Sequence, residues 1–235
     1  GRVDFMDEPI VCNHPRGKMK KSYAGAESER YLSLPTVSYT PDKITKRGIA
    51  RTFQNIRLFK SMTVFENVLT AMHVRRTSNV FSATFRANHK EEAAQREKAL
   101  ELLKIVGLDD VKNELATALP YGKQRRLEIA RALATSPKLL LLDEHTAALD
   151  PATAEKVLDL TRRVVAESHI TCLMVTHNMH QALELGNRTL MMADGHIVLD
   201  VAGSERAGMG VDDLIARFKA GAGHELDNDR ILLSE

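Results

Sequence analysis

Apolar runs that alternate with amphipathic segments predict an α/β fold with a mostly parallel sheet. Residues 138–143, KLLLLD, form an unbroken apolar run that ends on an acid, and residues 170–175, ITCLMV, form a second run. Short runs of this kind are typical of strands buried on both faces of a parallel sheet. Weaker strand patterns occur at 49–53 and at 2–10. Helical segments separate the later strands, and this alternation implies parallel crossovers.

Helical periodicity marks the segments between these strands. Residues 61–74 are predicted to form a helix capped by Thr63, with Glu66 three residues later in the spacing of a capping box. Residues 90–106 carry an apolar stripe opposite a charged face, and Gly107 ends this helix. The remaining predicted elements are helices at 122–135, 152–167 (after Pro151), 179–185 and 211–218, and a strand pair at 188–192 and 196–201 whose turn contains Gly195.

Composition narrows the classes of protein to which the chain can belong. With 33 basic and 31 acidic residues the net charge is +2, so the whole chain gives no electrostatic argument for nucleic-acid binding. Cys12 and Cys172 form no CxxC pattern, which argues against a disulfide framework or zinc site and fits a reducing compartment, with Cys172 in the core. No apolar stretch approaches the roughly 20 residues that span a bilayer, so any membrane role is expected to go through a partner.

Two acids end the leucine run and mark a candidate site. Asp143 and Glu144 follow the predicted strand directly, and parallel sheets bind ligands at the carboxyl ends of their strands. Asp143 could hold Mg²⁺, and Glu144 could polarise a water molecule. The alternative is a core strand that ends in a solvated acidic turn. His177 follows the next strand, and taken alone it is more often an ordinary histidine at a strand end.

Four separated segments agree in order and context with one known family. They are Gln54 after a strand, LPYGKQRRLEIARAL at 119–133, LLLLDE at 139–144 with Asp150, and His177. This set resembles the nucleotide-binding domain of ABC transporters, in which the segments are the Q-loop, the signature motif, the Walker B strand with its D-loop, and the switch histidine.

Different parts of the chain resemble two different branches of that family. The string RTFQNIRLF at 51–59 resembles the Q-loop of branched-chain amino-acid importers. The strings DEHTAALDP at 143–151 and VTHNMHQALELGNR at 175–188 resemble a less characterised importer branch, in which His145 stands where most relatives have proline. The origin of this mixture stays open between recombination, an intermediate lineage and a constructed chain.

The resemblance implies a RecA-like P-loop NTPase core with an added α-helical subdomain. The ATPase domain is expected at 46–219, with the helical subdomain at 62–135. An irregular segment is expected at 1–45 and a flexible tail at 220–235. The expected location is the cytoplasmic face of the cell membrane, where the chain would be a peripheral subunit.

The resemblance also implies ATP and Mg²⁺ as ligands and assigns roles to the candidate residues. Asp143 and Gln54 would contact the metal, Glu144 would be the general base, and His177 would contact the γ-phosphate. Gln54 would also link nucleotide state to the membrane subunit. The residues expected to contact a nucleotide through the signature motif and D-loop are Pro120, Tyr121, Gly122, Lys123, Gln124 and Asp150.

The signature segment departs from the family pattern at Pro120, where relatives usually have serine. Proline has neither a hydroxyl nor an N–H group, so it cannot donate a hydrogen bond to a phosphate. The Gly122 N–H and the positive end of the helix still can. Arg125 and Arg126 are expected beside that phosphate, in preference to a nucleic-acid patch.

The phosphate-cradling pattern GxxxxGKS or GxxxxGKT does not occur in residues 1–235. The nearest candidate, PRGKM at 15–19, lacks the upstream glycine and the following hydroxyl. In the family, a strand resembling residues 2–10 follows the phosphate-loop helix, so the chain is expected to begin downstream of that helix, with an insertion near 11–41. Apolar sheet surface should then be exposed.

The implied partners are a second ATP-binding subunit, in a head-to-tail homodimer or heterodimer, and transmembrane permease subunits, without nucleic acid. One alternative is a non-catalytic module or truncated fragment that docks a membrane subunit or completes a partner's ATP site. Another is an ABC ATPase acting on ribosomes or DNA, for which a second cassette or a long basic arm would be needed. Neither feature is present in the sequence.

Overall fold

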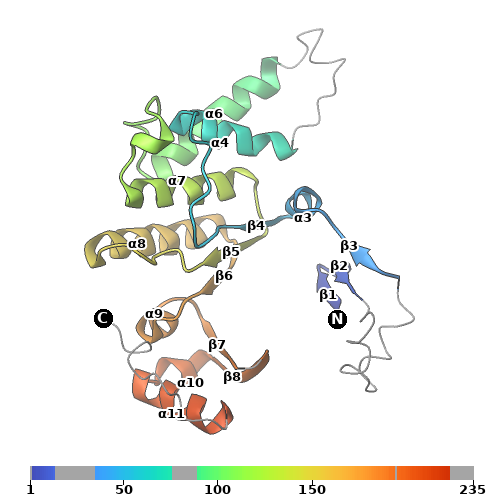
Figure 1. Cartoon of the computed structure of the whole chain (residues 1–235), viewed down its shortest axis with the longest axis vertical. Coiled ribbons are helices and arrows are strands. Elements are labelled where there is room, and N and C mark those ends of the chain that lie inside the picture. The colour runs from blue at the N-terminus through green and yellow to red at the C-terminus, as the bar shows by residue number, and fades with distance from the viewer. Residues whose placement is uncertain (1, 14–34, 76–88, 194, 223–235) are drawn as a thin grey trace.

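A computed structural model describes residues 2–13, 35–75, 89–193 and 195–222 (Figure 1). Its central sheet contains β4 (Ile49–Arg51), β5 (Leu139–Asp143) and β6 (Thr171–Val175), in the order β4-β5-β6. All pairings in this sheet are parallel, with Leu141 opposite Arg51 on one side and Leu173 on the other. The predicted parallel sheet is therefore confirmed, and β5 is its middle strand.

Burial of the sheet is less complete than the apolar runs predict. In β5, Leu140 and Leu142 are buried while the alternate leucines are only half-buried. In β6, Leu173 and Val175 are 48% and 51% exposed, so the prediction of a strand buried on both faces is wrong for β6. β6 pairs only with β5 among the described strands, and one of its faces is uncovered. The exposed apolar sheet surface that the sequence predicts occurs here.

The helices pack together above the sheet and form one continuous core with it. They are α4 (Val64–Met72), α6 (His89–Ile105), α7 (Tyr121–Ala134) and α8 (Pro151–Ser168), with short 3₁₀ turns at His73–Arg75 and Ala116–Ala118. Figure 1 shows α7 and α8 side by side, and α7 also packs against α4 and α6. The innermost side chains, all at most 1% exposed, include Val64, Val68, Ala99, Leu103, Val106, Leu108, Leu127, Ile129 and Leu142.

The predicted helix ends are confirmed where local chemistry specifies them. Thr63 Oγ1 accepts a hydrogen bond from the Glu66 N–H, and Glu66 Oε2 accepts one from the Thr63 N–H at 2.8 Å, which completes the capping box of α4. Gly107 has φ +64°, the left-handed conformation that favours glycine after α6. Pro151 occupies the first turn of α8, where its missing N–H costs nothing.

The amino-terminal residues contain more regular structure than the sequence pattern indicates. Two strands, β1 (Arg2–Phe5) and β2 (Glu8–Cys12), form an antiparallel hairpin in place of the single strand predicted within 2–10. Met6 and Asp7 make the turn with positive φ angles of 52° and 63°. β3 (Val37–Ser38) pairs with β2, and α3 (Pro41–Arg47) leads into the central sheet. The phosphate-loop candidate at 15–19 lies outside the described residues, and so does most of the insertion expected near 11–41.

The carboxyl-terminal part contains the predicted helix and strand pair and one additional helix. Its elements are α9 (Met179–Glu184), the antiparallel strands β7 (Arg188–Ala193) and β8 (His196–Ala202), α10 (Gly203–Ala207) and α11 (Val211–Ala222). Gly195 has φ +79°, as the predicted turn requires. The short helix α10 was not predicted, and the tail from residue 223 lies outside the described residues. Within the described ranges, no helix is both long and apolar enough to cross a membrane.

Candidate functional site

Three residues predicted for the site meet at the carboxyl end of the central sheet. The Nε2 atom of Gln54 donates a hydrogen bond to Glu144 Oε2 at 2.9 Å. On the other side of the same carboxylate, Nδ1 of His177 lies 3.3 Å from Glu144 Oε1. These side chains follow β4, β5 and β6 respectively, and the parallel strands bring them to one edge. The structure thus places one carboxylate between an amide and an imidazole.

Asp143 lies beside this group and is paired with an arginine. Arg51 Nη2 is 2.6 Å from Asp143 Oδ2, and the Asp143 side chain is 28% exposed. The Asp143 N–H lies 3.4 Å from the hydroxyl of Thr52, which is fully buried between the strands. Sequence reasoning did not single out Arg51, although its place in β4, opposite the leucine strand, was a usable signal.

The backbone at Glu144 is held in an uncommon conformation. Its φ of +42° lies in the left-handed region, which non-glycine residues rarely adopt. The Glu144 N–H donates to the carbonyl of Val175 at 3.0 Å, so the end of β6 fixes this turn. Strained residues of this kind persist where surrounding structure determines them, often at functional sites.

His145 anchors the same turn in the core. Its side chain is 1% exposed, and Nε2 lies 3.3 Å from Thr161 Oγ1 on α8. Thr161 directs its single hydroxyl proton to the Val157 carbonyl at 2.9 Å, so His145 supplies the proton of the contact with Thr161. Burial, and to a smaller degree the charge of Arg125, lowers the pKa of His145 to about 4. The imidazole is therefore neutral at physiological pH.

The predicted signature residues form the start of α7, where they pack on α8. Pro120 is the N-cap residue and makes no side-chain hydrogen bond to the helix. A Cβ atom on Gly122 would overlap Thr153 Cγ2, so the close approach of the two helices requires glycine. Gln124 Nε2 donates to the Leu119 carbonyl at 2.8 Å, and Lys123 pairs with Asp110 at 3.6 Å. The side chain of Tyr121 is exposed.

Asp150 has a structural function within this chain. Its Oδ1 accepts a hydrogen bond from the Thr153 N–H at 3.0 Å and so caps the N-terminus of α8. Hydrogen bonding by the Thr153 side chain and backbone lowers the pKa of Asp150. The predicted residues therefore fall into two groups. One surrounds Glu144, and the other, with Gly122 and Asp150, lies where α7 meets α8. Contact of either group with a nucleotide stays a prediction.

Arg125 and Arg126 do not have the predicted position beside a phosphate. Arg125 is completely buried, and it donates to the carbonyls of Phe53 and Gln54, at 2.7 Å each. Arg126 Nη1 donates to the Val106 carbonyl at 3.0 Å, at the end of α6. Both guanidinium groups bind backbone carbonyls, because the helix face that carries them is packed against other parts of the chain. That face looks polar in the sequence, so no signal there indicated burial.

The oxygen donors near Glu144 fit Mg²⁺ in the way that nucleotide enzymes hold it. Across the described ranges, no three His, Cys, Asp or Glu side chains cluster as a complete metal site. Mg²⁺ bound with a nucleotide needs only one or two protein oxygens, because phosphates and water supply the rest. The Asp143 carboxylate and the Gln54 amide oxygen are donors of the required type.

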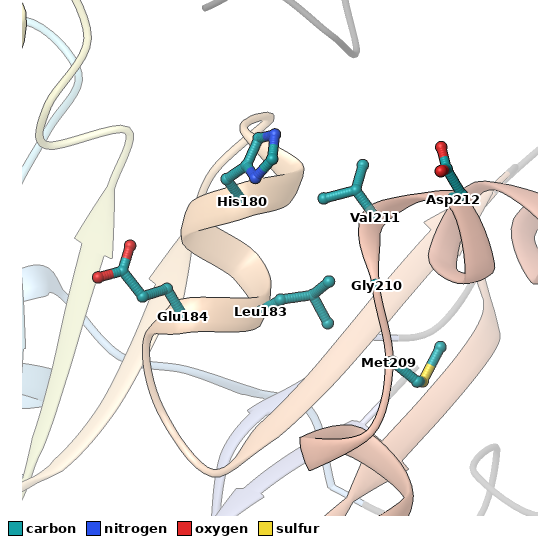
Figure 2. A pocket seen from close by; sticks show the side chains of 7 residues that line it. All are labelled: His180, Leu183, Glu184, Met209, Gly210, Val211 and Asp212. Carbon is teal, nitrogen blue, oxygen red and sulfur yellow. The ribbon is translucent and has the colours of Figure 1, made fainter.

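A separate groove of about 620 Å³ lies between α9 and α11 (Figure 2). Its polar side chains include His180, Glu184 and Asp212, and Figure 2 shows that they do not point at a common centre. Glu184 is already paired with Arg162 on α8. The groove uses none of the predicted site residues and shows no convergent chemistry.

Comparisons of the sequence and of the structure with known proteins point to the same family. Residues 22–147 match the profile described as ABC transporter. The chain is 36% identical over 160 residues to the high-affinity branched-chain amino acid transport ATP-binding protein BraF of Pseudomonas aeruginosa, covering 67% of this chain and 63% of BraF. It is 35% identical over 197 residues to a tyrosine transport ATP-binding protein of Clostridioides difficile, covering 82% of this chain and 76% of that protein.

Two solved structures show the same fold. The ATP-binding cassette MJ1267 of an ABC transporter superposes with a TM-score of 0.62 and 26% identity, over 80% of this chain and 73% of that chain. The ATP-binding cassette MJ0796, a dimer bound to ADP and Pi, gives a TM-score of 0.57 and 30% identity, over 73% and 71%. The matched segment spans less than two thirds of BraF, at 63% of its length.

Proposed function

The chain belongs to the ABC transporter family, and from this premise we propose that it is an ATP-binding and ATP-hydrolysing subunit of an importer. The observation that carries the proposal is the convergence of Gln54 and His177 on the carboxylate of Glu144, with Asp143 next in sequence. Hydrolysis of a phosphoanhydride requires a placed base and an oriented water molecule. The Glu144 carboxylate is contacted on both sides by side chains that follow the two neighbouring strands.

In this proposal Glu144 is the general base. Its carboxylate accepts a proton from the attacking water, and the Gln54 amide holds it at one oxygen. His177 approaches the other oxygen through Nδ1, and with both ring nitrogens protonated its Nε2–H would donate to a γ-phosphate. The uncommon backbone conformation of Glu144, fixed by Val175 and by buried His145, keeps this base in place before substrate arrives.

Asp143 and the Gln54 amide oxygen are the proposed Mg²⁺ ligands. When bound, the ion would neutralise charge on the phosphate oxygens. Arg51 pairs with Asp143 at 2.6 Å, and its own side chain is 54% exposed. An exposed ion pair of this kind contributes little free energy, so a cation can replace Arg51 at the carboxylate.

We assign the transported substrate to the amino-acid class. This rests on the similar proteins, whose names give branched-chain amino acids, tyrosine and methionine as the transported compounds. The proposed partners are a second ATP-binding subunit and transmembrane permease subunits, which would hold the chain at the cytoplasmic face of the membrane. The dimeric form of MJ0796 with ADP and Pi supports the first of these.

The sequence contains the residues proposed for hydrolysis but not the usual phosphate-binding pattern. Residues 1–235 contain no GxxxxGKS or GxxxxGKT segment, whose backbone N–H groups and lysine would cradle phosphates. We therefore infer that the chain alone binds ATP weakly at the Glu144 site. Beside a complete partner subunit, residues 121–124 at the start of α7 would complete the partner's site.

The experiment measures binding of a fluorescent ATP analogue and release of phosphate, for this chain alone and mixed with a complete ATP-binding subunit. We expect weak turnover alone, and ATP-dependent association in the mixture. Glu144→Gln should lower any turnover that this chain contributes by about 100-fold or more, whereas Glu101→Gln on the exposed face of α6 should not. Robust turnover by the chain alone that Glu144→Gln abolishes would contradict the inferred weakness. Absence of any nucleotide effect in the mixture would contradict the proposed function.

A second candidate function is a non-catalytic module that docks a membrane subunit. It is favoured by the exposed aromatic side chains of Phe53, Phe59 and Tyr121, which are 41–44% exposed around the loop that carries Gln54. Exposed aromatic groups are enriched at protein interfaces. Binding of a permease that is unchanged by ATP and by Glu144→Gln would favour this function over hydrolysis.

A further inference from the structure

The loop that joins β4 to α4 carries Gln54 and is held at its far end by two side chains. Asn67, fully buried on α4, donates to the Phe59 carbonyl at 3.1 Å and accepts from the Phe59 N–H at 3.0 Å. Arg131 on α7 donates to the Arg57 carbonyl and lies over the Phe59 ring at 4.8 Å. These contacts fix residues 57–59 but do not reach the peptide groups around Gln54.

The near end of the loop is held by a buried ion pair on α7. Nη1 of Arg125 donates to Glu128 Oε2 at 2.6 Å and to the Phe53 carbonyl at 2.7 Å, while Nη2 donates to the Gln54 carbonyl at 2.7 Å. Glu128 Oε1 in turn accepts from the Phe53 N–H at 3.2 Å. The two side chains are 0% and 7% exposed. Together they bind three backbone groups of residues 53 and 54.

These contacts restrict the direction of the Gln54 side chain. The Phe53 carbonyl belongs to the peptide plane before the Gln54 Cα, and the Gln54 carbonyl belongs to the plane after it. Because peptide units are planar, hydrogen bonds to both carbonyls restrict the two backbone angles of Gln54 and hence its Cα–Cβ direction. A planar guanidinium can hold two carbonyls at once, and a lysine ammonium holds them with no fixed angle between them.

Burial of this pair is costly, which argues that it has a purpose beyond packing. Two charges removed from water lose hydration that their mutual attraction repays only in part. The cost is visible at Glu128, whose pKa is raised because burial outweighs the opposing effects of the Phe53 N–H and of Arg125. A well-packed apolar pair could fill the same volume. It could not bind the backbone of residues 53 and 54.

We propose that Arg125 and Glu128 are positioning residues that aim Gln54 at Glu144, and so connect the start of α7 to the proposed general base. This inference rests on the proposed function for its significance, since Gln54 matters only if Glu144 acts on bound nucleotide. The geometric claim is independent of nucleotide: the Gln54 to Glu144 hydrogen bond forms because α7 holds residues 53 and 54.

The test reads the Gln54 side-chain amide by NMR in the nucleotide-free chain. Selective ¹⁵N-glutamine labelling gives four side-chain amide pairs, from Gln54, Gln95, Gln124 and Gln181. Loss of one pair in Gln54→Asn assigns the signal. Glu144→Ala removes the acceptor and gives the reference position of the Gln54 amide without its hydrogen bond.

Arg125→Lys and Glu128→Gln should move the Gln54 signal toward that reference position while leaving the Gln181 signal unchanged. Because Glu128→Gln adds a fifth glutamine pair, its Gln54 signal is assigned by the pair that is lost in the double variant with Gln54→Asn. The matched control is Arg126→Lys, which alters the adjacent arginine whose carbonyl partner is Val106 at the end of α6. It should leave the Gln54 signal unmoved. A second readout is hydrogen exchange of the peptide covering residues 52–58, which should be faster by at least roughly tenfold in the first two variants.

Circular dichroism establishes that each variant is folded, and if Arg125→Lys does not fold, Glu128→Gln still tests the claim. An unmoved Gln54 signal in the folded variants would overturn the proposal, as would an equal shift in Arg126→Lys. Failure of the chain to bind or hydrolyse ATP contradicts the proposed function but leaves these nucleotide-free measurements unaffected. The two failures are therefore distinguishable.

Discussion

Gln54 and Glu144 are 90 residues apart in sequence, and their side chains are joined by a hydrogen bond of 2.9 Å. The contact arises because β4 and β5 are parallel neighbours, so the residues that follow them leave the sheet at the same edge. Gln54 itself is exposed, and its side-chain partner Glu144 is not one of the buried core residues. Substitution of Gln54 should therefore change catalysis with little effect on the stability of the fold.

Replacing Gln54 by alanine should lower ATP turnover while the fold stays intact. We expect turnover in the assembled complex to fall by roughly 10- to 100-fold, because the base loses the group that orients it. The free energy of unfolding should change by less than about 0.5 kcal/mol, as at other exposed positions. Asn55→Ala, in the same exposed loop, is the matched control. Equal losses of turnover in both variants would indicate a general effect of the loop.

Much of the site could be predicted because its residues lie at the ends of strands that the apolar runs predict. Asp143 ends β5, Glu144 follows it, and His177 lies two residues after β6, and strand ends of a parallel sheet share an edge. The capping box at Thr63 was equally visible, since its chemistry is local. Strand ends and helix caps can therefore be predicted from sequence, because they depend on residues close together in the chain.

Other features depend on what the fold brings from a distance. The exposure of β6 depends on how many strands pair with it, and an apolar run does not encode that number. Arg125 was predicted to face a ligand, because the helix pattern alone does not reveal that the loop after β4 covers it. His145 looked like a departure from the family pattern. Its burial became apparent only with Thr161 of α8 beside it.

Gly122→Ala should destabilise the contact between α7 and α8. The new methyl group would overlap Thr153 Cγ2, and overpacking of this kind costs about 1–3 kcal/mol. Thr153→Ser removes that methyl group and keeps the N–H that binds Asp150, so the double variant should recover most of the loss. Gly208→Ala meets only ordinary contacts of 3.8 Å or more and should change stability little.

Urea unfolding of the two single variants and the double variant gives the coupling free energy between positions 122 and 153. A value near zero would show that α7 and α8 adjust their distance instead of clashing. In that case the glycine at position 122 would need another explanation, such as close approach of a ligand to the backbone.

The two cysteines should react slowly in the folded chain. Burial raises the pKa of the Cys172 thiol to about 11, so very little reactive thiolate is present near neutral pH. Cys12 is 1% exposed, so reagents have little access to its thiol. At pH 8, alkylation followed by mass spectrometry should show little labelling of either residue before urea is added, and complete labelling of both afterwards. Rapid labelling of Cys172 in the folded chain would indicate that β6 opens locally.

Acid should destabilise the fold through His145, and the sign follows from its pKa. The folded pKa of about 4 is below the ordinary histidine pKa of about 6.5, so the unfolded chain binds a proton between these limits and the folded chain does not. Stability from this residue is complete above about pH 6.5 and is lost as the pH falls toward 4. The free energy of unfolding falls by about 3 kcal/mol in total, and about 2 kcal/mol of this is lost by pH 5.

Urea unfolding of wild type and His145→Leu across this pH range isolates the contribution of His145, because the other titrating groups are common to both proteins. His196→Leu, at an exposed position of β8, should follow the wild-type curve. Parallel curves for wild type and His145→Leu would contradict the buried neutral imidazole.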